Sequence, residues 1–285
     1  MLVNMKEMLN KAKEFKYAVA QFNINNLEWT RFILEECQNN NSPVILGVSE
    51  GAAKYMGGFK TVADMVRDLI DYLNINVPVC LHLDHGSSFS VCKEAINSGF
   101  TSVMIDASKF DLDKNIDITK EVVSYSKKFN ITVEGEIGHV GSDKNPDNEG
   151  IMYANVDDCV KYCQETGLDF LAPALGSVHG LYKGEAKLNF DRMLEISKLT
   201  NLPLVLHGGT GIDDEKIKKA ISCGIAKINF NTELQIAWSN ALKSKINECN
   251  EYDPRKIIKM GEEELKKCVK KKIILLGCND CYNTQ

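Results

Sequence analysis

Five histidines are distributed along this sequence, and each falls at or just after the carboxyl end of a predicted strand. They are His82, His85, His139, His179 and His207. In a barrel of parallel strands these ends form one face, so the side chains there come together. Three imidazoles from separate strands, His85, His179 and His207, would make an open zinc site with a position left for water or substrate. The alternative is a set of unrelated polar loop residues, and His82 is expected to play a supporting or structural role.

A carboxylate stands directly before one of these histidines. Asp84 precedes His85 in residues 81–86, which close an apolar run that begins at residue 77. A histidine beside a carboxylate at a strand end can hold a metal while the carboxylate handles a proton. The alternative is a strand that simply ends in polar residues near solvent.

Three further acids lie on predicted strands. Asp106 ends one strand, and Glu134 and Glu136 lie two residues apart on the next, so they share a face. Buried acids are rare unless they are paired or bind a metal. They would form a second cation position or orient the metal ligands, and the alternative is a structural salt bridge in the barrel mouth. Glu136, nearer the strand end, is the better metal candidate.

Two polar or glycine-rich turns, residues 207–211 and 229–233, each lead into a predicted helix. Backbone N–H groups at a helix N-terminus bind phosphate, and barrels often place a phosphate there. Residues 176–180, followed by Lys183, would complete the pocket. A metal beside a phosphate site suggests a phosphorylated sugar or ketone as the substrate.

Eight short apolar runs, each followed by a helical stretch, have to position these residues. The strands are predicted at residues 17–23, 43–48, 77–85, 102–106, 131–137, 169–175, 203–206 and 226–229. Helices are predicted at 4–15, 27–39, 61–73, 89–97, 116–128, 156–165, 213–222, 232–247 and 254–276, with another before the seventh strand. This alternation predicts a closed (β/α)8 TIM barrel, one domain over residues 1–285 with an N-terminal helix and a C-terminal helical extension. An open doubly wound sheet is the runner-up, but it more often carries a Gly-x-Gly-x-x-Gly turn after its first strand, which residues 23–26 lack.

Composition narrows the classes of partner. The chain has 285 residues and a net charge of -5, which argues against a nucleic-acid or anionic-membrane partner. The start lacks the apolar core of a signal peptide, and no apolar run approaches the ~18 residues of a membrane span. A cytoplasmic location is therefore expected, with the ten cysteines reduced. Cys278 and Cys281 have redox or zinc spacing, but no second pair accompanies them.

The sequence resembles the class II, metal-dependent fructose-bisphosphate aldolases, in the branch that also holds tagatose-bisphosphate aldolases. The resemblance extends along nearly the whole chain. The motifs that carry it are residues 21–26, 47–51, 81–86, 172–180, 206–211 and 227–229.

The resemblance implies roles for individual residues. His85, His179 and His207 would hold one catalytic zinc ion, and Asp84 would be the acid/base group. Asp106 and Glu136 match acids that bind a second or displaced metal, which leaves room for a second divalent or a monovalent cation. The predicted substrate contacts are Asn23, Ser49, Gly180, Lys183, Gly208, Gly209, Thr210, Asn229, Phe230, Asn231, Thr232 and Arg255.

The implied reaction is the reversible cleavage of D-fructose 1,6-bisphosphate to dihydroxyacetone phosphate and D-glyceraldehyde 3-phosphate. Breaking C3–C4 leaves negative charge on the ketone half, which zinc would stabilise as a Lewis acid without a lysine Schiff base. Asp84 would take the C4 hydroxyl proton. The long polar stretch 138–155 is expected to be mobile without substrate and to close over the site, with Glu149 as a proton shuttle.

Alternatives of other classes remain at this point. A barrel metallohydrolase would use zinc to activate water and would need no two phosphate turns, and a silent phosphosugar-binding protein would need no intact constellation. Tagatose 1,6-bisphosphate is the alternative substrate, although Asn231 and the turn 208–211 resemble the fructose-specific members. Arg255 follows an Asp-Pro pair. Related aldolases use such an arginine to reach a phosphate in the neighbouring subunit, which predicts a homodimer or homotetramer.

Overall fold

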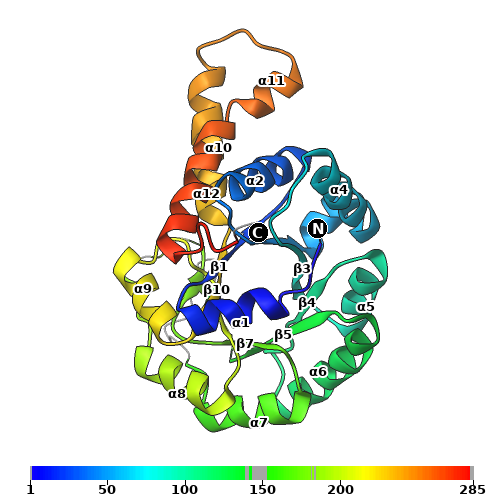
Figure 1. Ribbon diagram of the computed structural model, residues 1–285, viewed down its shortest axis with the longest axis vertical. Helices are drawn as coiled ribbons and strands as arrows, with labels where there is room; N and C mark the ends of the chain where they lie inside the picture. The colour runs from blue at the N-terminus through cyan, green and yellow to red at the C-terminus, as the bar shows by residue number, and fades with distance from the viewer. Residues whose placement is uncertain (1, 139–140, 143–152, 181, 183, 283–285) are drawn as a thin grey trace.

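Eight parallel strands form a closed barrel surrounded by helices, as Figure 1 shows in the computed structural model. The structure describes residues 2–138, 141–142, 153–180, 182 and 184–282. The strands follow one another around the barrel in the order β1-β10-β9-β7-β5-β4-β3-β2. Their bounds are β1 Val19–Asn23, β2 Val44–Ser49, β3 Val79–Gly86, β4 Ser102–Ile105, β5 Thr132–Ile137, β7 Phe170–Pro173, β9 Leu204–Leu206 and β10 Ile225–Phe230. The predicted (β/α)8 TIM barrel is therefore confirmed.

The helices cover the outside of the barrel and its amino end. They are α1 Lys6–Phe15, α2 Leu27–Asn39, α3 Glu50–Tyr55, α4 Phe59–Tyr72, α5 Phe89–Ser98, α6 Leu112–Ser126, η1 Lys127–Phe129, α7 Val156–Thr166, α8 Phe190–Thr200, α9 Asp214–Ser222, α10 Thr232–Ile246, α11 Pro254–Lys259 and α12 Glu262–Leu276. Several begin where a polar side chain caps the first turn, as Asn26, Asp111 and Asn155 do for α2, α6 and α7. None of the helices in the described ranges combines the length and apolar character that crossing a membrane requires.

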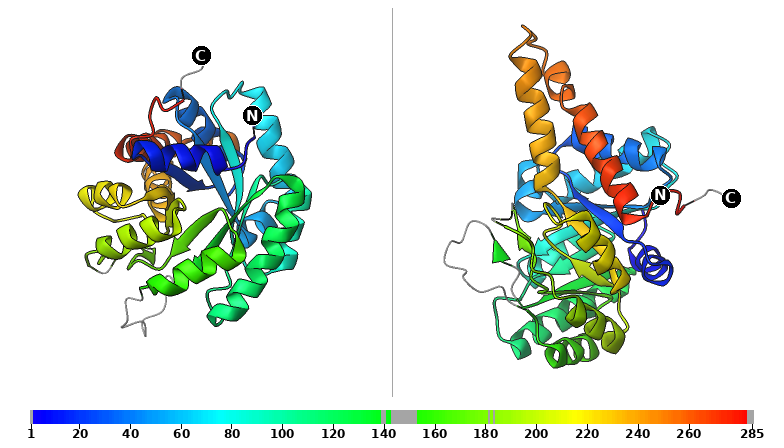
Figure 2. Two further views of the ribbon diagram at one scale, coloured as in Figure 1. Left: turned by 60° about the horizontal axis from the view of Figure 1, so that its bottom comes forward. Right: turned by 90° about the vertical axis from the view of Figure 1, so that its left-hand side faces the viewer.

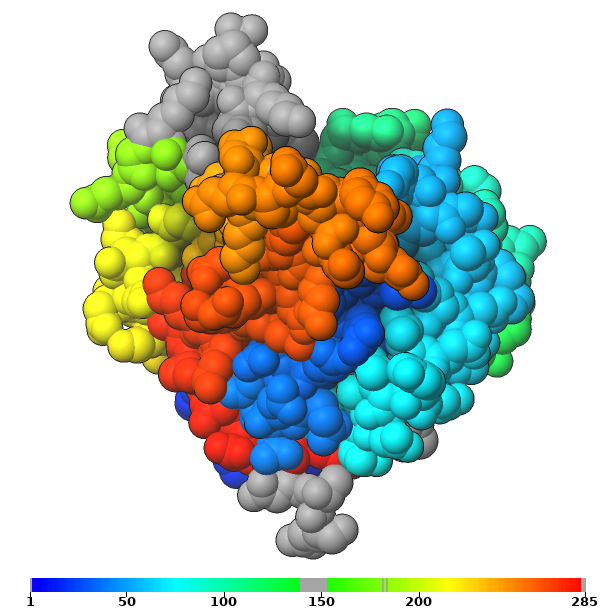
Figure 3. Space-filling model, turned by 90° about the horizontal axis from the view of Figure 1, so that it is seen from above, coloured from blue at the N-terminus to red at the C-terminus, as the bar shows by residue number. Residues whose placement is uncertain are grey.

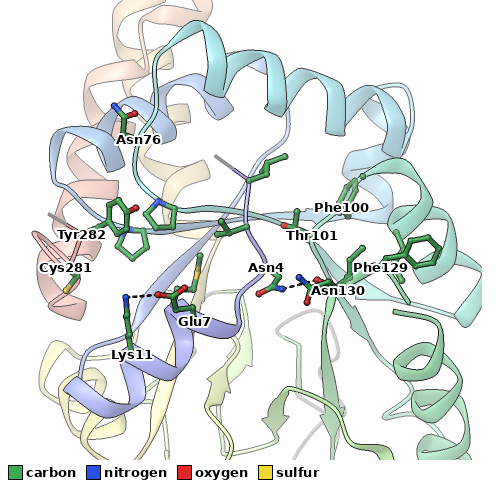
Figure 4. Close-up of a pocket in the computed structure, with 18 of the residues that line it drawn as sticks. Asn4, Glu7, Lys11, Asn76, Phe100, Thr101, Phe129, Asn130, Cys281 and Tyr282 are labelled. Carbon is green, nitrogen blue, oxygen red and sulfur yellow. Dashed lines mark hydrogen bonds and ion pairs between the residues drawn. The ribbon is translucent and has the colours of Figure 1, made fainter. Parts of the chain in front are cut away.

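The amino end of the barrel is covered by α1 and holds a cavity of about 640 Å³ (Figure 4). Its walls carry many apolar side chains, and its charged groups are already paired. Lys11 Nζ lies 2.8 Å from Glu7 Oε1, and Asn4 Nδ2 donates to the carbonyl of Asn130 at 2.9 Å. Since catalytic groups of barrels lie at the opposite, carboxyl face, we assign this cavity no chemistry.

Helices α10, α11 and α12 form an arm that extends beyond the barrel (Figures 1 and 2). Figure 3 shows the orange α10–α11 segment on the outer surface of this arm. The prediction of one helix over 254–276 was wrong, because the helix is interrupted at Met260 and Gly261, between α11 and α12. A side chain at Gly261 would overlap the indole of Trp238, whose Nε1 donates to Ile258 at 3.2 Å. The break thus lets α11 fold back against α10.

A small second sheet connects two loops at the carboxyl end of the barrel. Its strands are β6 Gly141–Ser142 and β8 Val178–His179, which pair in parallel. Neither strand was predicted, and the stretch 143–152 between them lies outside the described residues. The backbone at Gly208, with φ of 67°, comes so close to the carbonyl of Val178 that a side chain there would collide with it. The loop after β9 is therefore held against β8, next to His179.

Candidate active site at the carboxyl mouth of the barrel

A cavity of about 420 Å³ opens at the carboxyl ends of the strands. Its lining comes from β1, β2, β3, β5 and β10 and from the loops that follow β4, β7 and β9. The lining residues are Asn23, Asn25, Ser49, Asp84, His85, Asp106, Glu136, His179, Gly180, Gly208, Thr210, Asn229, Asn231 and Thr232. The structure thus brings together residues that are up to about 200 positions apart in the sequence.

The end of β3 is irregular, and this irregularity places two functional side chains in the same cavity. Consecutive residues of a regular strand point to opposite faces. Here the register with β4 shifts between Leu83 and Gly86, and His85 has a left-handed φ of 55°. Such a bulge redirects side chains, so that Asp84 and His85 both line the cavity.

Asp84 is a buried carboxylate held by two amides. Asn23 Nδ2 donates to its Oδ2 at 2.8 Å, and Asn229 Nδ2 donates to its Oδ1 at 3.4 Å. Burial opposes ionisation, but the nearby His85, His207 and Lys227 and the bond from Asn23 outweigh it and hold the pKa of Asp84 below its usual range. Asp84 is therefore ionised and oriented at neutral pH, as a group that accepts a proton must be.

The three predicted zinc ligands lie together. The ring centroid of His85 is 5.0 Å from that of His179 and 4.7 Å from that of His207, and the centroids of His179 and His207 are 5.8 Å apart. One nitrogen from each ring lies within 4.8 Å of the others. Three imidazoles with an open side suit a catalytic metal site.

Two of these rings are fixed by carboxylates on their far side. His85 Nδ1 lies 2.9 Å from Asp106 Oδ2, and His207 Nε2 lies 2.8 Å from Glu134 Oε1. The remaining nitrogens, His85 Nε2 and His207 Nδ1, face each other at 3.0 Å. Two bare imidazole nitrogens this close repel unless a proton or a metal ion lies between them. A proton satisfies this pair in the metal-free protein, and a metal ion bound to both nitrogens would take its place.

The candidate metal ligands differ in their protonation. Burial and the neighbouring His85 and His207 lower the pKa of His179 to about 3, so its imidazole is neutral at pH 7. Burial alone would lower the pKa of His85 too, but the bond to Asp106 and the charge of Asp84 raise it to about 9. His179 is thus ready to bind a metal at neutral pH, whereas a metal at His85 displaces a proton.

Asp106 and Glu136 lie on the β4 and β5 side of the cavity and form a second cluster with His85. One ligand atom from each of the three lies within 4.8 Å of the others. Ser108 Oγ donates to both acids, at 2.7 Å to Asp106 and 3.2 Å to Glu136. This arrangement is compatible with the predicted second cation position.

Polar groups line the opposite side of the cavity, where β10 leads into α10. The Oδ1 atoms of Asn229 and Asn231 are buried and have no hydrogen-bond partner among the described residues. Thr210 Oγ1 accepts from the N–H of Glu233 at 3.3 Å and so caps the first turn of α10. The N–H of Thr232, at the first position of the helix, has no partner within it. This side therefore offers acceptors for hydroxyl groups and a helix N-terminus for an anion.

Not every predicted contact lies in the cavity. The Phe230 side chain is fully buried, with its ring centroid 6.2 Å from that of Phe22, so only its backbone could contact a substrate, and this contact stays a prediction. The N–H of Gly209 donates to Asn229 at 3.0 Å and is not available to a phosphate. Arg255 lies on the arm, outside this chain's own cavity.

Two further predicted residues, Lys183 and Glu149, lie outside the described residues, and their roles stay predictions. Asn25 was missed, although it lies in the motif 21–26. Lys227 was also missed, and the signal was a lysine in the middle of an apolar strand.

The fold and the site together define a barrel enzyme whose carboxyl mouth carries a histidine cluster suited to a metal. The model of the family described as fructose-bisphosphate aldolase class-II matches residues 3–281. The chain belongs to this metal-dependent family, and it is accordingly a carbon–carbon lyase.

Several known proteins are similar to the chain. The fructose-bisphosphate aldolase of Geobacillus stearothermophilus is 57% identical over 270 residues, which is 94% of each protein. That of Staphylococcus aureus strain Mu50 is 55% identical over 281 residues, 98% of each. The crystal structure of the YdjI aldolase from Escherichia coli K12 superposes with a TM-score of 0.88 at 33% identity, covering 99% of this chain and 100% of that one.

Proposed function

We propose that this protein catalyses the reversible aldol cleavage of D-fructose 1,6-bisphosphate to dihydroxyacetone phosphate and D-glyceraldehyde 3-phosphate. The observation that carries the proposal is the convergence of His85, His179 and His207 with Asp84 in one cavity at the carboxyl mouth. The relatives named fructose-bisphosphate aldolase support the choice of substrate.

Each part of the cavity has a proposed task. The three histidines would hold a zinc ion, which when bound supplies a Lewis acid for the charge that develops on the ketone half. Asp84 accepts the C4 hydroxyl proton as the C3–C4 bond breaks, and returns it in the condensation direction. Asn23 and Asn229 keep its carboxylate aligned for this transfer.

The polar side of the cavity would bind the substrate's ketone-phosphate end. Gly180, Gly208 and Thr210 line it, together with Asn231 and Thr232 at the start of α10. The Oδ1 atoms of Asn229 and Asn231, which have no partner in the described part of the chain, suit hydroxyl donors. Ser49, on the opposite wall, is proposed to contact the aldehyde half, although its Oγ also accepts from the N–H of Ala52 at 3.2 Å.

We expect kcat/KM to be higher for D-fructose 1,6-bisphosphate than for D-tagatose 1,6-bisphosphate. The two sugars differ only in the configuration at C4, whose hydroxyl Asp84 has to reach, and the geometry for proton transfer is strict. The amides of Asn23 and Asn229 fix Asp84 in one orientation, so it should serve one epimer. Measuring kcat/KM for both sugars under the same conditions tests this, and a ratio in favour of the tagatose sugar would reverse the assignment of substrate without affecting the aldol chemistry.

We also propose that the protein forms a homo-oligomer, at least a dimer, through the helical arm. Only Leu234 is buried among the residues of α10. Tyr252 is 89% exposed, and Ile236 and Ile246 also present apolar surface to solvent. A second copy of the chain would cover this surface. Arg255, whose guanidinium is held by Asp253 at 2.7 Å, would then reach the neighbour's cavity and bind a phosphate there.

Sedimentation velocity should therefore give a dimer or larger species, and Arg255→Ala should raise KM for the bisphosphate. A matched control is Lys256→Ala, which removes a neighbouring exposed cation that pairs with Glu251. If Arg255 acts on the substrate, only its own substitution changes KM. A monomer with full activity would contradict the shared site.

A further inference from the structure

A network of buried polar side chains runs beneath the histidine cluster, across the interior of the barrel. It starts at His207 and passes through Glu134, Lys227, His82 and Ser102, all of them buried. Barrel interiors are usually filled by branched apolar side chains, and a buried charge is costly unless it is paired. Lys227 does not line the cavity, so direct contact with a substrate does not explain it.

Short contacts connect the members of this network. Glu134 lies between two of them, with Oε1 at 2.8 Å from His207 Nε2 and Oε2 at 2.6 Å from Lys227 Nζ. Lys227 Nζ is also 3.5 Å from His82 Nε2. His82 Nδ1 is 3.0 Å from Ser102 Oγ, and Ser102 in turn donates to the carbonyl of Thr132 at 3.2 Å.

The groups at the two ends of this buried network fix the direction of each hydrogen bond. The carbonyl of Thr132 can only accept, so Ser102 donates its single proton there and accepts from His82 Nδ1. Burial lowers the pKa of His82 to about 3, so the ring is neutral and carries one proton. Its Nε2 is then an acceptor for the ammonium of Lys227, which can only donate.

The same reasoning determines which nitrogen of His207 carries the proton. An ionised carboxylate can only accept. Glu134 accepts from Lys227 through one oxygen, so its other oxygen must accept from His207 Nε2. The proton that His207 keeps when it binds a metal is therefore on Nε2. Its Nδ1, which faces His85 Nε2 at 3.0 Å, is left bare and able to bind a metal.

We propose that Lys227 is a positioning residue for the metal site: through Glu134, it holds His207 in the tautomer that presents Nδ1 to the metal. His82, which is itself held by Ser102, contacts the ammonium of Lys227 from the other side. The proposal deepens the proposed function, because it rests on the role of His207 as a metal ligand. Hydrogen-bond partners behind a metal-ligating histidine typically change metal affinity by about 10–100-fold.

Zinc affinity, measured by competition with a chromophoric chelator, tests the proposal in four proteins. Lys227→Met should weaken zinc binding by roughly 10–100-fold relative to wild type. The double variant Glu134→Gln/Lys227→Met should regain most of this loss, because the amide oxygen still accepts from His207 and no buried charge is left unpaired. Lys266→Met is the control, since Lys266 pairs with Glu35 and Glu262 on α2 and α12, and it should bind zinc like wild type.

The histidine tautomers can also be measured directly in the unaltered protein. ¹⁵N NMR of the imidazole nitrogens, assigned with His207→Gln and His82→Gln, should show opposite tautomers for the two rings. We expect His207 to carry its proton on Nε2, with and without zinc, and His82 to carry its proton on Nδ1. If Lys227→Met gives no folded protein by circular dichroism, this measurement decides alone.

Zinc affinity of Lys227→Met within threefold of wild type would overturn the role of Lys227, and so would a proton on Nδ1 of His207. A wild-type protein that binds no zinc would instead overturn the proposed metal site. The measured tautomers would still show whether the buried network places the proton of His207 on Nε2. The two failures are therefore distinguishable.

Discussion

Replacing His179 with alanine is expected to abolish tight zinc binding and nearly all cleavage activity. His179 is neutral at pH 7 and contributes one of the three clustered nitrogens. With two ligands left, the site would no longer hold the ion that stabilises the developing negative charge. Loss of such Lewis-acid stabilisation costs several kcal/mol, which corresponds to roughly 10³-fold or more in rate. Zinc content by elemental analysis and kcat/KM by a coupled triose-phosphate assay would measure both effects.

Chelation of the wild-type protein provides the matched control for His179→Ala. Activity should disappear on treatment with a strong chelator and return when zinc is added to the wild type. The variant should not recover at the same zinc concentration. A His179→Ala protein that retains stoichiometric zinc and normal kcat/KM would show that His179 is not a ligand.

Replacing Asp84 with alanine should slow cleavage by about 10²–10⁴-fold, the usual contribution of a general acid/base group. Zinc content should be largely unchanged, because the three histidines supply the nitrogen ligands and Asp84 bonds instead to Asn23 and Asn229. Asp84→Asn is the closer comparison, since it keeps the size of the side chain but cannot take up the proton. It should be slowed by a similar factor. An Asp84→Ala enzyme within tenfold of wild type would refute the assignment.

The barrel and the clustering of the three histidines could be predicted because they rest on local patterns. Apolar runs alternating with helical stretches specify the strand order of a parallel barrel, and the rule that strand ends share a face brings His85, His179 and His207 together. The buried position of His82 also follows from its place inside an apolar run. These features need no knowledge of side-chain packing.

Other features depend on tertiary contacts that the sequence pattern does not encode. The bulge that directs the side chains of Asp84 and His85 into the same cavity arises where β3 pairs with β4. At the break before α12, Gly261 lies against the indole of Trp238, where any side chain would overlap. Phe230 was assigned to the substrate site because of its neighbours in the motif, but the strand's alternation turns its side chain into the core.

The measurement that tests the central claim most directly is a ³¹P NMR experiment on D-fructose 1,6-bisphosphate with metal-depleted and zinc-restored protein. We predict that the zinc-restored protein converts the sugar to dihydroxyacetone phosphate and D-glyceraldehyde 3-phosphate in equal amounts, with no inorganic phosphate. The metal-depleted protein should leave the sugar intact. Release of inorganic phosphate, absence of triose phosphates after zinc is restored, or undiminished cleavage by the metal-depleted protein would contradict metal-dependent aldol cleavage.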